Sequence, residues 1–272
     1  MIDQQYLARA VPAISYGELI RHDSFHSKIL NNSRTLIVYL PPGYHADQRR
    51  RYPVLYFQDG QNLFDGSTSY IPGQHWRLNE TADYLINAGE AEPVIIVGIY
   101  NAGSERIAEY TPSADPNFKV GGRADLYGRM LVEEVKPFID GEYRTLAGAA
   151  NTGIGGSSLG GLVSLYLGLR HPETFGKLAV LSPSLWWDRQ RMLREVVKLK
   201  AKPPVRVWLC VGTEEGRSGL THAAKLRDKL NRLGFELGDD LKFMAVEGGR
   251  HTEKDWACRA DHVLRFLFPR QD

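Results

Sequence analysis

The 272-residue sequence contains only two cysteines, Cys210 and Cys258, and they lie far apart along the chain. Two cysteines cannot build the disulfide framework of a small secreted domain. No combination of cysteine and histidine has the spacing of a metal site either. We therefore expect neither disulfide bonds nor a bound metal.

An excess of charge of one sign is also missing. The chain has 34 Lys and Arg against 32 Asp and Glu, a formal net charge of +2. A balance of this kind gives no reason to expect a nucleic-acid partner.

Long hydrophobic runs are absent as well. None approaches the roughly 18 apolar residues of a membrane-spanning helix, so we expect no membrane association. The start, MIDQQYLARA, lacks the basic and apolar regions of a secretory signal. This predicts a cytoplasmic protein, or a secreted one if a leader was removed. No sequence feature predicts the oligomeric state.

The composition is that of an average soluble protein, with 43% hydrophobic and 24% charged residues. No repeat, low-complexity segment or linker divides the chain. A chain of this length suits one large α/β domain over residues 1–272, with residues 1–25 set apart as an N-terminal extension.

Short apolar runs typical of strands alternate with helical patterns along most of the chain. In the last helical pattern, for example, Trp256, Ala260 and Leu264 recur on one face. This alternation predicts an α/β fold with a mostly parallel sheet, helices on both faces and an antiparallel N-terminal edge. The expected strands are 27–30, 34–40, 54–57, 94–100, 152–156, 178–181, 205–211 and 241–246.

The stretch GGSSLGG, residues 155–161, combines two serines with four glycines between a short strand and a helical segment. In that context the pattern G-x-S-x-G is typical of a nucleophile elbow. The small residues two before and two after the serine let the chain turn sharply. Only Ser158 has glycines at both positions, since Leu159 would occupy one of them if Ser157 were central. Ser158 is therefore the candidate nucleophile.

A nucleophilic serine needs a base and an acid that orients it, and in this arrangement they follow in the order Ser, Asp/Glu, His. Glu214 and Glu215 follow the strand at 205–211, and sequence physics does not choose between them; Asp188 is a third candidate. His251 follows the strand at 241–246 and precedes the final helix. It is therefore the candidate base.

Acyl transfer also requires hydrogen-bond donors for the oxyanion of the tetrahedral intermediate. The backbone N–H of Leu159, directly after the nucleophile, is one expected donor. The second should come from the loop after the strand at 54–57. We predict the N–H of Gln61, with Asn62 as the alternative.

Six sequence blocks, spread from about residue 34 to about residue 268, together resemble the putative-esterase family of α/β-hydrolases. Its members include enterochelin-type and feruloyl esterases, acetyl-xylan esterases and mycolyltransferases. The blocks are YPVLYFQDGQNLFD, GIYNAGSERIAEYTP, GGSSLGG, SPSLWWD, GTEEG and GGRHTEKDW.

The resemblance implies a role for each matching residue. Ser158 matches the family nucleophile, His251 the base and Glu215 the acid, although some siderophore-esterase relatives work with a serine–histidine dyad. Gln58 stands where the family usually has histidine. We expect this difference to alter the packing of the loop and not the chemistry.

The resemblance further implies a serine carboxylic-ester hydrolase that forms an acyl-enzyme on a small-molecule ester and needs no cofactor. Short-chain, aryl, carbohydrate and siderophore esters all remain candidate substrates. Trp186, Trp187 and Tyr110 are candidate substrate-binding residues, as is Asn62, and the loop at 110–123 has the length of a lid or binding loop. The alternatives are an acyltransferase on the same fold and a non-catalytic binding protein.

Overall fold

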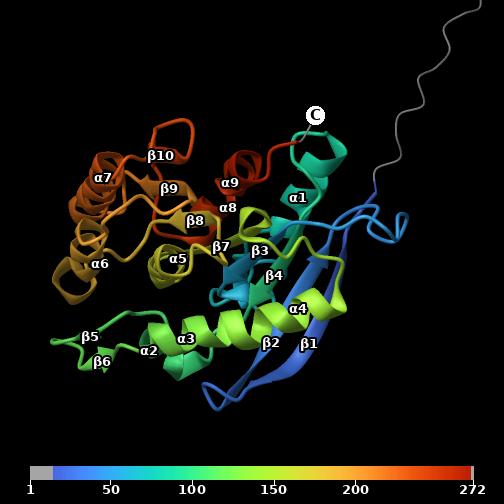
Figure 1. Ribbon diagram of the computed structural model, residues 1–272, viewed down its shortest axis with the longest axis horizontal. Helices are drawn as coiled ribbons and strands as arrows, with labels where there is room; N and C mark the ends of the chain where they lie inside the picture. The colour runs from blue at the N-terminus through green and yellow to red at the C-terminus, as the bar shows by residue number, and fades with distance from the viewer. Residues whose placement is uncertain (1–14, 271–272) are drawn as a thin grey trace, which may run out of the picture.

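The computed structural model describes residues 15–270, which form an eight-stranded sheet flanked by helices (Figure 1). The strand order in the sheet is β1-β2-β4-β3-β7-β8-β9-β10, and β5 and β6 form a separate two-stranded hairpin. The strands are β1 (Glu18–Ser27), β2 (Asn32–Leu40), β3 (Val54–Gln58), β4 (Ile95–Ile99), β5 (Ala114–Asp115), β6 (Val120–Gly121), β7 (Thr152–Ser157), β8 (Lys177–Leu181), β9 (Arg206–Gly212) and β10 (Leu241–Val246).

The pairing confirms the predicted architecture. β2 runs antiparallel to both β1 and β4, whereas the six strands from β4 to β10 in the sheet order are parallel. Strands β3 and β4 are buried throughout, because helices cover both faces of the sheet.

The first strand lies earlier in the chain than the predicted strand at 27–30, since β1 ends at Ser27 and residues 28–31 form the turn into β2. β1 starts at Glu18 and pairs with β2 from Glu18↔Leu40 onward, so residues 18–25 belong to the sheet and not to an extension. Most of its side chains are exposed or half-buried, and such a strand lacks the apolar run that would reveal it. The remainder of the predicted extension includes residues 1–14, which lie outside the described residues.

Two hydrophobic cores occupy the opposite faces of the sheet. One includes residues of α3, α4, α5, α6 and α7, and the other includes residues of α1, α8 and α9 (Figure 1). The helices are α1 (Leu78–Asn87), α2 (Arg106–Glu109), α3 (Ala124–Met130), α4 (Lys136–Glu142), α5 (Leu159–Arg170), α6 (Trp187–Val197), α7 (Arg217–Arg232), α8 (Glu253–Ala257) and α9 (Ala260–Leu267). A π-helical segment, Leu131–Val135, joins α3 to α4.

The final helical pattern is divided in two. Trp256, Ala260 and Leu264 are all buried, as their spacing predicts. The backbone nevertheless leaves the helix at Arg259, where φ is −109°, so α8 and α9 are separate. The side chain of Arg259 is buried and reaches toward the loop after β9.

Parallel strands bring the loops that follow β3, β7, β8, β9 and β10 to one edge of the sheet. Every residue for which the sequence predicts a catalytic role lies in one of these loops or at the start of the helix that follows. In residues 15–270, no helix has both the length and the apolar composition needed to cross a membrane.

Candidate active site

Ser158 occupies a sharp turn between β7 and α5. Its backbone angles are φ 57° and ψ −122°, a conformation that non-glycine residues rarely adopt. A Cβ atom on Gly156 would lie 2.8 Å from the carbonyl carbon of Gly160, and one on Gly160 would lie 3.0 Å from the Cβ of Gln58. A side chain at position 156 would therefore collide with backbone, and one at position 160 would crowd the side chain of Gln58.

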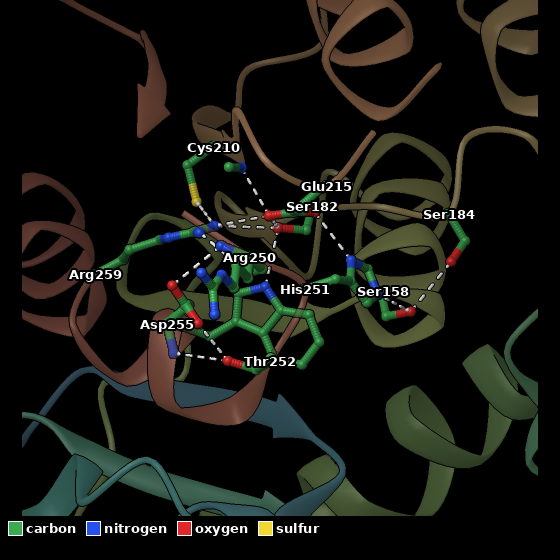
Figure 2. A network of polar contacts seen from close by, with 12 residues as sticks. Ser158, Ser182, Ser184, Cys210, Glu215, Arg250, His251, Thr252, Asp255 and Arg259 are labelled. Atoms are coloured by element: carbon green, nitrogen blue, oxygen red, sulfur yellow. Dashed lines mark hydrogen bonds and ion pairs between the residues drawn. The ribbon is translucent and has the colours of Figure 1, made fainter. Parts of the chain in front are cut away.

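Three side chains from different loops form a hydrogen-bonded line at this turn (Figure 2). His251 Nε2 lies 3.0 Å from Ser158 Oγ, and His251 Nδ1 lies 2.9 Å from Glu215 Oε2. The ring of His251 also packs edge-on against Trp256. This geometry can pass a proton from the serine hydroxyl to an imidazole that a carboxylate orients.

The two adjacent glutamates have different surroundings. Glu215 is buried, whereas Glu214 is exposed and pairs with Arg250 at 2.9 Å. Asp188, the third predicted acid, accepts a hydrogen bond from Ser113 Oγ. The structure thus brings Glu215, and neither alternative, to His251.

Glu215 is held as a carboxylate by several donors. Oε1 accepts hydrogen bonds from Ser182 Oγ at 2.6 Å and from the N–H of Gly212 at 2.7 Å, and Arg259 Nη1 lies 3.2 Å away. Burial by itself would raise the pKa of Glu215, but the hydrogen bonds from His251, Ser182 and Gly212 outweigh it and lower the pKa.

The loop after β3, which carries the predicted donor Gln61, forms a tight turn beside the cavity that contains Ser158. A 3₁₀ turn spans Gly60–Asn62, and a Cβ atom on Gly60 would lie 2.4 Å from the carbonyl carbon of Gly98. Asp59 precedes the turn in a left-handed conformation, with φ 56°, and the guanidinium of Arg106 binds its carboxylate at 2.7 and 2.8 Å. Gln61 is thereby held at the edge of the cavity that contains Ser158.

Leu159, the other predicted donor, is the first residue of α5. The first four N–H groups of an α-helix have no partner within it and carry partial positive charge. The predicted position beside the nucleophile is therefore suited to a developing negative charge.

Gln58 ends β3 beneath this turn. Its side chain is buried, and its Oε1 accepts a hydrogen bond from the hydroxyl of Tyr127. The residue that departs from the family pattern thus takes part in packing and does not line the cavity beside Ser158.

A cavity of about 480 Å³ opens beside Ser158 and His251, and a smaller one of about 250 Å³ lies beside His251 and Glu215. Tyr70 lines the larger cavity and Trp186 the smaller, and these two aromatic side chains are 83% and 48% exposed. A larger groove between α6 and α7, about 660 Å³, contains none of the predicted residues.

Two predicted substrate-binding residues need correction because their side chains are buried. Tyr110 is fully buried, and its hydroxyl accepts a hydrogen bond from the N–H of Asp59. Trp187 is 3% exposed, and its indole N–H donates to the carbonyl of Ser113 at 2.8 Å. Both therefore support the surrounding loops and do not reach the cavities.

Asn62 lines the larger cavity, but its side-chain amide is engaged by the protein. Nδ2 donates to Glu253 Oε1 at 3.0 Å, and Oδ1 accepts from the N–H of Tyr70 at 2.8 Å. Both polar atoms of the Asn62 side chain therefore have partners within the protein and are not free to bind a ligand.

Three residues at or beside the site, Tyr70, Glu253 and Arg259, were not predicted from the sequence. Glu253 is buried in the wall of the larger cavity, where the indole N–H of Trp76 also donates to it. Burial raises the pKa of Glu253 to about 7, although the hydrogen bond from Trp76 opposes the change. The signal available in the sequence was that two charged residues, Glu253 and Arg259, lie close to the apolar Trp256 in the segment before the final helix.

Among residues 15–270, no group of three or more His, Cys, Asp or Glu side chains is arranged to hold a metal ion.

The parallel sheet, its antiparallel edge and the serine at the turn into α5 define an α/β-hydrolase fold. Residues 27–259 match the family described as putative esterase. The chain therefore belongs to this family, and its class of activity is carboxylic-ester hydrolysis.

Similar proteins include YbbA of Bacillus subtilis, 27% identical over 250 residues that cover 87% of this chain and 93% of YbbA. The iron(III) salmochelin esterase of Escherichia coli is 30% identical over 244 residues, which cover 84% of this chain. The match spans about half of that enzyme, 53% of its length.

A solved structure of a ferulic acid esterase superposes with a TM-score of 0.74 at 20% identity. The match covers 93% of this chain and 98% of the esterase. At this level of identity the similarity establishes the fold.

Proposed function

We propose that the protein is a serine esterase in which Ser158, His251 and Glu215 act as a catalytic triad. The observation that supports it most strongly is the line of contacts at 3.0 Å and 2.9 Å from Ser158 Oγ through His251 to Glu215. Three side chains from loops more than 30 residues apart meet in the order that nucleophilic catalysis requires.

In this mechanism His251 Nε2 takes the proton of Ser158 as Oγ attacks the ester carbonyl. The N–H groups of Leu159 and Gln61 stabilise the oxyanion. His251 then donates the proton to the leaving alcohol, and an acyl-serine remains. Water, activated by the same imidazole, attacks the acyl-enzyme and releases the acid and the free Ser158 hydroxyl. Glu215 stabilises the imidazolium that forms in each half-reaction.

We infer that the substrate is a small ester with an aromatic part. Trp186 and Tyr70 line the two cavities at His251 and expose aromatic surface to solvent. Aromatic faces stack well on aryl groups. Relatives with the fold or sequence of this chain include a ferulic acid esterase and a salmochelin esterase, which supports aryl esters over simple acetates.

The proposed nucleophile is tested by p-nitrophenyl acetate and butyrate hydrolysis in Ser158→Ala and its neighbour Ser157→Ala. We expect Ser158→Ala to abolish hydrolysis and labelling by a fluorophosphonate, and Ser157→Ala to retain both. Activity in Ser158→Ala would overturn the proposal.

The proposed acid is tested by the matched pair Glu215→Gln and Glu214→Gln. The orienting acid of a triad can contribute about ten-thousandfold to kcat. We expect a large loss in Glu215→Gln and a change within about twofold in Glu214→Gln, because Glu214 pairs with Arg250 at the surface.

The substrate class is tested by comparing kcat/KM for methyl ferulate, a catecholate trilactone and acetylated xylan. Preference for either of the two esters with an aromatic part is expected, and preference for acetylated xylan would contradict the aromatic assignment.

A further inference from the structure

Arg259 lies in the turn between α8 and α9 and reaches Glu215 from the side opposite His251 (Figure 2). Its side chain is 2% exposed. Nη1 lies 3.2 Å from Glu215 Oε1 and 3.1 Å from Ser182 Oγ, and Nη2 lies 3.4 Å from the carbonyl oxygen of Arg250. The guanidinium therefore contacts both the proposed acid and the residue that precedes His251.

The two oxygens of Glu215 have different tasks. Oε1 is surrounded by three donors, from Ser182, Gly212 and Arg259, whereas Oε2 faces His251 Nδ1. Rotation of the carboxylate would have to break the contacts of Oε1 first. The donors at Oε1 thus determine where Oε2 points.

Ser182 depends on the same guanidinium. It has φ 44°, and its Oγ receives hydrogen bonds from the indole N–H of Trp256 at 2.9 Å and from Arg259 while donating to Glu215. Arg259 therefore holds Glu215 directly and through Ser182.

The charge of Arg259 is also matched to this position. Within residues 15–270 its ion-pair partner is Glu215. The other titratable groups facing it are Cys210 of β9, with Sγ 4.0 Å from Nη1, and Asp255 of α8, which accepts hydrogen bonds from Thr252 and Arg250. Removing one member of a buried ion pair leaves the other charge uncompensated.

We propose that Arg259 is a positioning residue of the triad, whose buried guanidinium holds Glu215 so that Oε2 faces His251. This inference rests on the proposed catalytic roles of Ser158, His251 and Glu215.

The first test is a double-mutant cycle between Arg259→Met and Glu215→Gln. We expect Arg259→Met alone to lower kcat at least about tenfold with KM changed less than about twofold, because the acid acts in the transition state. In the Glu215→Gln background the same substitution should cost less than about threefold, since no carboxylate remains to be held. An equal fold decrease of kcat in the two backgrounds would overturn the proposal.

The second test compares Arg259→Lys with Arg259→Met. Lysine keeps a cation within reach of Glu215, so we expect Arg259→Lys to recover a large part of the kcat that Arg259→Met loses. Equal losses of kcat in the two variants would contradict a role for the cation at this position.

Folding is controlled in the same set of proteins. The double variant lacks both buried charges and should melt at a higher temperature than Arg259→Met alone. If Arg259→Met does not fold, Arg259→Lys replaces it in the wild-type and Glu215→Gln backgrounds. An equal fold decrease of kcat in the two backgrounds would again reject the proposal. Fluorophosphonate labelling tests the proposed function separately. If labelling is lost only in Ser158→Ala, the proposed nucleophile is supported even when the mutant cycle rejects the role of Arg259.

Discussion

Asn62 Nδ2 donates a hydrogen bond of 3.0 Å to Glu253 Oε1, and this contact joins segments 191 residues apart. Asn62 belongs to the turn that carries Gln61, and Glu253 follows His251 by two residues. Both side chains are buried, so little water competes for the bond. The proposed oxyanion donor and the proposed base are thereby held at a fixed separation.

Breaking this contact should reduce catalysis more than binding. We expect Asn62→Ala to lower kcat for p-nitrophenyl butyrate by about tenfold to a hundredfold, because the N–H of Gln61 loses its alignment. Ser67→Ala, in the exposed part of the same loop, is the control and should keep wild-type kcat. A normal kcat in Asn62→Ala would show that the turn holds its position without Glu253.

Glu253 should make stability depend on pH. Its pKa is raised from 4.5 to about 7, so between these pH values the folded state keeps a proton that the unfolded state has released. The folded state therefore loses stability as the pH rises through this range, on the order of 3 kcal/mol. Urea unfolding of the wild type and Glu253→Gln at about pH 5 and about pH 8 measures it.

The wild type should lose unfolding free energy between about pH 5 and about pH 8, and Glu253→Gln should lose less. Glu247→Gln, which removes an exposed carboxylate, should behave as the wild type does. Identical pH dependence in all three proteins would exclude Glu253 as the titrating group.

Trp186 and Trp187 are adjacent but should respond differently to truncation. Trp186→Ala removes an exposed ring, so we expect KM for methyl ferulate to rise severalfold with little change in stability. Trp187→Ala removes a buried ring and should cost about 3 to 5 kcal/mol of unfolding free energy. Steady-state kinetics and urea unfolding distinguish them, and a stability loss confined to Trp186→Ala would reverse the assignment.

The glycine before the serine turn should not tolerate a methyl group. In Gly156→Ala the new Cβ would meet backbone of Gly160 at 2.8 Å, so either the turn shifts or α5 moves. We expect loss of most esterase activity and a lower melting temperature. Gly148→Ala is the matched control, because its φ is −73° and no heavy atom lies within 4 Å of the added Cβ. Equal behaviour of the two variants would contradict the steric argument.

The sequence alone predicted the mostly parallel sheet with its antiparallel N-terminal edge, and the loops that hold Ser158, Glu215 and His251. Those predictions depend on local signals: apolar runs mark buried strands, and parallel strands bring the loops after them to one edge. The contacts between the three side chains follow from that topology.

The contacts of Arg259 and Glu253 could not be predicted in this way. Arg259 meets Glu215 across 44 residues, and Glu253 meets Asn62 across 191, and no local pattern encodes either pairing. For Tyr110 the sequence predicted a role in substrate binding that the structure does not support. An aromatic residue in a loop can pack in the interior as well as bind a ligand. Only the fold, which seals Tyr110 beneath Asp59, distinguishes them.

The β5–β6 hairpin stands apart from the eight-stranded sheet, and Phe118 near its tip stacks on Trp187 and lies beside Trp186. Neither the serine turn nor the loops that carry Glu215 and His251 belong to this hairpin. A change at its tip would therefore alter the surroundings of Trp186, and with them the aromatic surface offered to a substrate, without moving the residues of the proposed triad.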